Sequence, residues 1–89
     1  MPRVVKLDIF IAEQIGNKPV TEIPGIGQIL GSKLSKAGFD TASSVLGQFL
    51  LFKMNKDYFC DWMIEICQAK PYIAETCWWS LYQWCENFL

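Results

Sequence analysis

Residues 23–34 read Ile23-Pro24-Gly25-Ile26-Gly27-Gln28-Ile29-Leu30-Gly31-Ser32-Lys33-Leu34, and this stretch decides the fold of the chain. It predicts a helix–hairpin–helix, in which a short helix ends near Ile23 and a second helix follows Gly27. Gly25 and Gly27 lack a Cβ, so they can adopt a positive φ and let another molecule approach the backbone closely. The N–H groups that open the second helix have no intrahelical partners and carry the positive end of its dipole. Because this combination suits a phosphate, we predict that the turn binds a nucleic-acid backbone.

The remaining segments also show helical patterns. Residues 4–12 fit a helix or a strand, and a helix is favoured because no second segment could pair with a strand. The second hairpin helix is expected over 27–36, and two more helices are expected after a capping residue, Asp40 or Thr41 for one and Asn55 for the other. The positions expected to be buried on these three helices are Ile26, Ile29, Leu30 and Leu34; Val45, Leu46, Phe49 and Leu50; and Phe59, Trp62, Met63 and Ile66.

The last helix is predicted to begin at Pro71. Proline has no backbone N–H, and it is tolerated in the first turn because N–H groups there have no acceptor within the helix. Its expected water-facing residues are Glu75, Thr76, Ser80, Gln83, Glu86 and Asn87. Its two apolar stripes consist of Ile73, Cys77, Leu81, Trp84 and Phe88, and of Trp78, Tyr82 and Cys85. A helix with so wide an apolar surface is normally buried on two sides, so we expect a second subunit, with a thicker core as the alternative. The predicted fold is all-α, a single domain over residues 1–89 that forms a compact bundle of five to six short helices.

The composition argues against catalysis and metal binding. The 89 residues include no histidine, and 8 Lys+Arg against 9 Asp+Glu leave a formal net charge of −1. The four cysteines form no C-x-x-C pair, so they are interpreted as small buried hydrophobes rather than zinc ligands. The row Asp57, Asp61 and Glu65 is typical of a solvated helix face. We expect no enzyme activity, no metal and no cofactor, and the charge argues against strong non-specific DNA binding.

The location of the protein is constrained by two features of the sequence. No apolar run approaches the length of a membrane span, so no membrane insertion is expected. Free cysteines are typical of a reducing compartment.

Several short segments carry a resemblance that extends over all 89 positions without an evident gap. They are Ala12-Glu13, Lys18-Pro19-Val20, Gly25-Ile26-Gly27, Leu30-Gly31, Lys33-Leu34, Gly38-Phe39-Asp40, Leu46-Gly47-Gln48-Phe49-Leu50, Trp84-Cys85 and Phe88-Leu89. In these segments the chain resembles the barrier-to-autointegration factor family. The resemblance implies an all-helical dimer, of the chain with itself or with a paralogue, that holds double-stranded DNA through its backbone without sequence preference. It also implies a nuclear location, with the cytoplasm as an alternative, and LEM-domain proteins of the nuclear envelope as partners.

The resemblance further implies individual site residues. Those for DNA are Lys6, Gly25, Gly27, Ile29, Leu30 and Lys33, and those for the protein partner are Gly47 and Leu51. The chain departs from the family pattern at Ser32, Pro71 and Glu75, where relatives have small or basic residues. A carboxylate near a phosphate repels it by about 1 kcal/mol at 4 Å in a high dielectric. DNA bridging weaker than in relatives is therefore expected, and the alternative is a protein–protein module of the same fold that modulates a DNA-binding paralogue.

Four additional aromatic residues stand where relatives are smaller or more polar. They are Tyr72, Trp78, Trp79 and Tyr82. They indicate altered surface recognition, or alternatively an unusually filled core.

Overall fold

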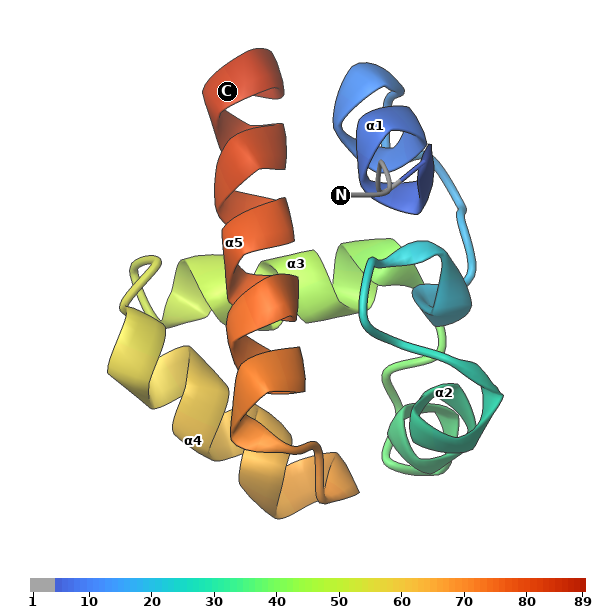
Figure 1. Ribbon diagram of the computed structural model, residues 1–89, viewed down its shortest axis with the longest axis vertical. Coiled ribbons are helices and arrows are strands. Elements are labelled where there is room, and N and C mark those ends of the chain that lie inside the picture. Colours follow the sequence, from blue (N-terminus) through green and yellow to red (C-terminus); the bar gives the residue numbers. More distant parts are fainter. Residues whose placement is uncertain (1–4) are drawn as a thin grey trace.

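The computed structural model of the protein describes residues 5–89, and this part of the chain consists of helices joined by loops and turns (Figure 1). Its elements in chain order are α1 (Val5–Ala12), the 3₁₀ helix η1 (Val20–Glu22), α2 (Gln28–Lys36), α3 (Ala42–Leu51), α4 (Lys56–Cys67) and α5 (Pro71–Phe88). No strand occurs between residues 5 and 89. The predicted all-α bundle is therefore confirmed, and the first helix begins at Val5, while Val4 lies outside the described residues.

The helix starts follow from local capping chemistry. Thr41, rather than Asp40, caps α3, because its hydroxyl accepts a hydrogen bond from the backbone N–H of Ser44 at 3.2 Å. Asn55 caps α4 in the same way, and its side-chain oxygen accepts from the N–H of Tyr58 at 2.9 Å. Pro71 occupies the first turn of α5. These three helix starts were predicted from the sequence and are confirmed.

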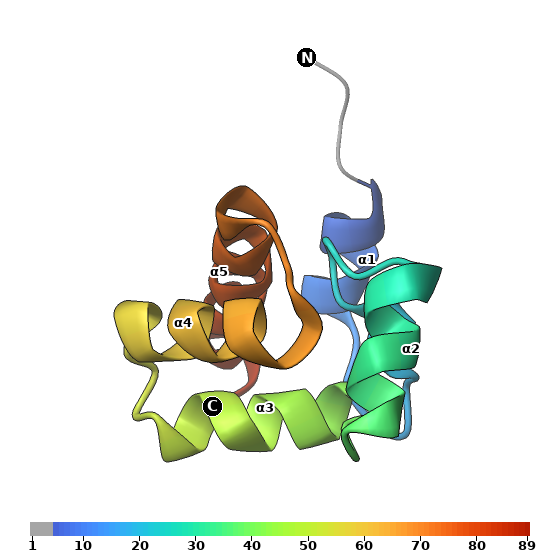
Figure 2. The ribbon, with the colours of Figure 1, turned by 90° about the horizontal axis from the view of Figure 1, so that it is seen from below.

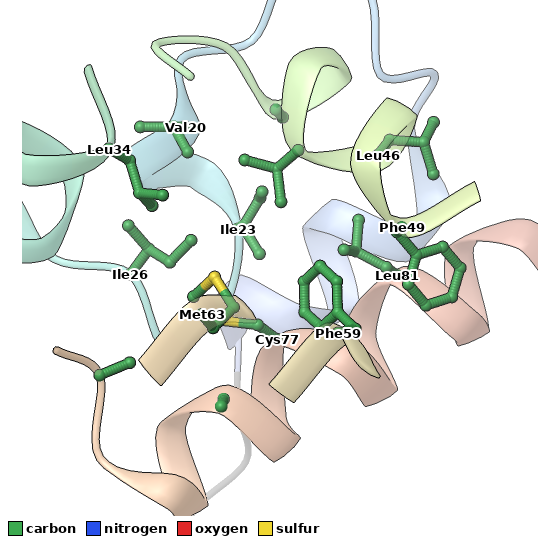
Figure 3. Close-up of a cluster of buried hydrophobic side chains, with 14 of the residues drawn as sticks. Val20, Ile23, Ile26, Leu34, Leu46, Phe49, Phe59, Met63, Cys77 and Leu81 are labelled. Carbon is green, nitrogen blue, oxygen red and sulfur yellow. The ribbon is translucent and has the colours of Figure 1, made fainter. Parts of the chain in front are cut away.

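Helix α5 crosses the bundle and packs against α4 on one side and α1 on the other (Figures 1 and 2). The core lies where α5 meets the hairpin, α3 and α4, and its labelled members in Figure 3 are Val20, Ile23, Ile26, Leu34, Leu46, Phe49, Phe59, Met63, Cys77 and Leu81. The rings of Phe49 and Phe59 meet edge to face with centroids 5.6 Å apart. This arrangement joins α3 to α4.

The position of Ile29 was predicted wrongly. The prediction placed it on the buried side of α2, but its side chain is 75% exposed. Helix α2 instead contacts the bundle through Gly31 and Leu34, which are both buried. Since each helical residue turns the chain by about 100°, Ile29 lies about 200° around the helix from Gly31 and faces water.

Three further positions differ from the predicted stripes. Leu50 and Phe88 are exposed, because α3 and α5 use Phe49 and Trp84 for their core contacts. Ser80 was expected to face water but is fully buried. Its hydroxyl donates to the carbonyl of Thr76 at 2.7 Å, which removes the cost of burying it. The predicted core positions that are only half-buried are Leu30, Trp62, Ile66, Ile73, Trp78 and Tyr82.

The four cysteines carry free thiols, and three of them, Cys67, Cys77 and Cys85, are buried as predicted. Cys60 is half-buried. Between residues 5 and 89 there is no group of three potential metal ligands. No helix in the same range is long and apolar enough to cross a membrane.

Candidate nucleic-acid interface

The hairpin turn rests directly on α5. Gly25 has φ +94°, a left-handed conformation that side chains rarely adopt. A Cβ at Gly25 would lie 3.3 Å from Sγ of Cys77 and 3.4 Å from the carbonyl oxygen of Ile73. The Cys77 thiol also donates to the carbonyl of Pro24 at 3.4 Å. Gly25 is therefore needed both for its φ and for its close contact with α5.

Gly27 has a different role from the one predicted. Its φ is −96°, so the positive φ suggested by the sequence occurs in this turn only at Gly25. Gly27 is the N-cap residue of α2, and a Cβ there would meet nothing within 4 Å. No side chain caps this helix. The first N–H groups of α2 are thus left for water or a ligand, as the phosphate hypothesis requires.

A lysine from α1 reaches the turn. The Nζ of Lys6 donates to the carbonyl of Ile26 at 2.9 Å, which places a positive charge between the two hairpin glycines. Lys6 also lines a cleft of about 300 Å³ together with Lys18 and Glu22. Lys18 forms an ion pair with Glu13, and Glu22 is itself acidic, so Lys6 supplies the cationic side of this cleft.

The other implied DNA-contact residues lie on α2. Ile29 and Lys33 are exposed and Leu30 is half-buried. Burial raises the pKa of the Cys67 thiol at the end of α4, and a backbone hydrogen bond from Ala69 and the positive charge of Lys33 partly offset this effect. The structure thus brings Lys6 to the hairpin turn. Lys33 lies on α2, more than one helical turn after the start of this helix.

The implied partner site is separate from the hairpin. Gly47 and Leu51 lie one turn apart on α3, and Leu51 is 74% exposed. A Cβ at Gly47 would meet nothing within 4 Å, so a partner could approach the α3 backbone there. Figure 2 shows α3 along one edge of the bundle, beneath α4.

Glu75 does not point at the hairpin. Its carboxylate lies 3.5 Å from the Nζ of Lys56 on α4. Ile73 and Cys77, two residues away on each side, are the ones that contact Gly25. Since two helical residues turn the chain by about 200°, Glu75 faces away from the turn. Lys56 was missed from the sequence, because only the packing of α4 on α5 brings it to a residue 19 positions away.

The comparisons with known proteins agree with this architecture. The family model described as "Barrier to autointegration factor" matches residues 1–88. The chain belongs to the barrier-to-autointegration factor family. Its similar relatives include the barrier-to-autointegration factors of Drosophila melanogaster, 51% identical over 80 residues, and of Homo sapiens, 45% identical over 80 residues. The match covers 90% of this chain in both cases, and 89% and 90% of those two relatives.

Proposed function

We propose that this protein binds double-stranded DNA without sequence preference, as a chromatin protein of the nucleus. The observation that carries the proposal is the uncapped N-terminus of α2, which opens at Gly27 beside the Lys6 ammonium group. Membership of the barrier-to-autointegration factor family supports it. The exposed N–H groups and the ammonium group bind a phosphate, and phosphate contacts carry no sequence information.

The binding is weaker than that of a strongly basic protein. Lys6 and Lys33 supply two cationic contacts, while Ser32 adds none. Release of the counterions from two phosphates gives a slope of about −2 in a plot of log affinity against log salt. Glu75 reduces the affinity less than its sequence position suggests, because its charge is paired with Lys56.

Bridging requires two DNA sites in one particle. We propose that the protein forms a dimer, with itself or with a paralogue, so that each hairpin holds one duplex. Gly47 and Leu51 of α3 are proposed as the site for LEM-domain proteins of the nuclear envelope. Their exposure and spacing of one turn suit a partner that lies along α3.

A titration with a short random-sequence duplex tests the DNA proposal. We expect the wild-type protein to bind at low salt, and Gly27→Glu to abolish binding because its carboxylate occupies the phosphate position. The variant folds, since φ at Gly27 is ordinary and the space is open. Mixing two differently labelled duplexes tests bridging by their co-migration with the protein. Absence of binding at low salt would overturn the proposal.

The second candidate function is a protein–protein module that modulates a DNA-binding paralogue. It is favoured by the net charge of −1 and by the exposed carboxylate of Glu75. It predicts no duplex binding by the protein alone and a changed DNA affinity of the paralogue in the mixture. The same titration, repeated with and without the paralogue, separates the two functions.

A further inference from the structure

One face of α5 combines aromatic rings with carboxylates and takes no part in the hairpin contacts. We call this face the α5 aromatic strip, and it consists of Glu75, Trp78, Trp79, Tyr82 and Glu86. These positions follow the spacing that places residues on one side of a helix. Trp79 is 48% exposed, which is high for so large an apolar side chain. The Nε1–H of Trp78 donates to the carbonyl of Met54 at 2.9 Å, so this end of the strip lies beside the turn that joins α3 to α4.

The three rings of the strip are held against one another. The ring centroids of Trp78 and Tyr82 are 5.2 Å apart with an interplanar angle of 25°. Those of Trp79 and Tyr82 are 6.0 Å apart and almost parallel, at 10°. The faces of such rings carry partial negative charge, and the strip therefore presents an ordered surface suited to cations.

One end of the strip already holds a cation from the chain itself. The Nζ of Lys56 lies 5.7 Å from the Trp78 ring centroid and 3.5 Å from Oε1 of Glu75. Its ammonium group is thus bound by a ring and a carboxylate together. This contact shows which chemistry the surface accepts.

The other end has the same two groups. Glu86 lies one helical turn after Tyr82, and hydrogen bonding to its carboxylate together with its negative charge raises the pKa of Tyr82. The last turn of α5 contains no basic residue, and the negative end of the helix dipole lies there as well. Tyr82 and Glu86 therefore form a ring-and-carboxylate pair like that of Trp78 and Glu75, at the negative end of the helix. The Trp79 ring stacks on Tyr82 and extends this pair.

We propose that the α5 aromatic strip binds a short basic segment of a partner protein. A lysine or arginine of that segment lies on Trp79 and Tyr82 beside Glu86, as Lys56 lies on Trp78 beside Glu75. The strip from Glu75 to Glu86 is about 16 Å long at the helical rise, which is the length of about five extended residues. The Glu86 carboxylate and the negative end of the helix dipole repel phosphate, so this surface recognises a basic peptide rather than DNA.

Fluorescence anisotropy with a labelled peptide of alternating arginine and glycine tests the proposal, and the same peptide with neutral citrulline is the ligand control. We expect the arginine peptide to bind and the citrulline peptide not to bind. Trp79→Ala and Glu86→Gln each weaken binding about fivefold. Glu65→Gln is the matched control, because it removes an exposed carboxylate of α4 outside the strip and leaves binding unchanged.

Lys56→Ala separates the proposal from general damage to the fold, because the proposal predicts tighter peptide binding and damage would weaken it. It frees Trp78 and Glu75 for the peptide, so binding tightens about two- to fivefold. Equal binding of both peptides, or a wild-type affinity of Trp79→Ala, would overturn the proposal. The alternative occupant of the strip is a second copy of the chain, and sedimentation tests it. If the wild-type protein does not bind the peptide and Trp79→Ala changes the oligomeric state, the strip is an interface between copies. Gly27→Glu leaves peptide binding intact, which separates this proposal from the DNA site.

Discussion

The ammonium group of Lys6 donates a hydrogen bond to the carbonyl of Ile26 at 2.9 Å, and this contact links α1 to the hairpin turn across 20 residues of sequence. Lys6 therefore has a structural role in the contact between α1 and the turn, and it also supplies a positive charge at the turn. The bond holds the ammonium group at the residue before Gly27, which is the N-cap of α2, and Lys6 remains exposed to solvent.

We therefore expect Lys6→Ala to lower the affinity for DNA and to make that affinity depend less on the salt concentration. Loss of one phosphate contact reduces the slope of log affinity against log salt by about 1. Lys53→Gln is the control, because Lys53 lies in the exposed turn after α3 and keeps its left-handed backbone with glutamine. Duplex titrations over a range of salt concentrations measure both values. Equal slopes for Lys6→Ala and the wild type would place the phosphate contact elsewhere.

The two hairpin glycines differ in what alanine does to them. Gly25→Ala lowers the free energy of unfolding by about 1–3 kcal/mol, because it places a Cβ in a left-handed conformation. The new methyl group would also lie 3.3 Å from Sγ of Cys77. Gly27→Ala costs less than about 1 kcal/mol, since φ is ordinary and the space is empty. Urea unfolding of both variants measures the difference, and a larger loss for Gly27→Ala would contradict the geometry of the turn.

Two apolar residues near each other in the sequence have opposite roles. Phe49→Ala lowers the stability by about 3–5 kcal/mol, because its fully buried ring packs on Phe59. That is a large part of the stability expected of one small domain. Leu51→Ala changes the stability by less than about 0.5 kcal/mol, since the side chain faces water. Thermal unfolding gives both values, and binding of a LEM domain then tests whether Leu51→Ala affects the partner site alone.

Alkaline pH destabilises the protein through its buried thiols. Burial raises the pKa of Cys77 from the usual 9.0 to about 12. The folded state therefore favours the neutral thiol, and this contribution to stability is complete below pH 9 and is lost as the pH rises from 9 towards 12. We expect the urea midpoint to fall over that range, and to fall less steeply in Cys77→Ala. The alanine variant starts from a lower stability at neutral pH, so the comparison rests on the slope and not on the midpoint itself.

Local chemistry explains why much of the fold was predictable. Thr41, Asn55 and Pro71 begin their helices through contacts within a few residues, and such contacts are visible in the sequence. The exposure of Ile29 was not predictable, because it depends on which side of α2 meets the rest of the bundle. Gln68 ends α4 in a left-handed conformation at φ 57° without the glycine that usually marks such an end.

The candidate site likewise combines features that the sequence predicts with features that depend on the folded chain. The glycine turn and the free N-terminus of α2 follow from residues 23–34 alone, whereas Lys6 was assigned only through the family resemblance. The pairing of Glu75 with Lys56 joins two helices and could be found only in the folded chain. Sequence reasoning did not anticipate that Lys56 pairs with Glu75 and lies over the Trp78 ring.

Gly31 brings the two arms of the hairpin into contact. A Cβ at this buried residue would lie 2.6 Å from Cγ2 of Thr21, so the methyl group of Thr21 packs directly on the α2 backbone. This close contact packs the two arms of the hairpin against each other. In the proposed phosphate site, the conformational entropy of shaping the turn is lost when the chain folds rather than when DNA binds. A preorganised site of this kind can retain useful affinity with only two lysines around it.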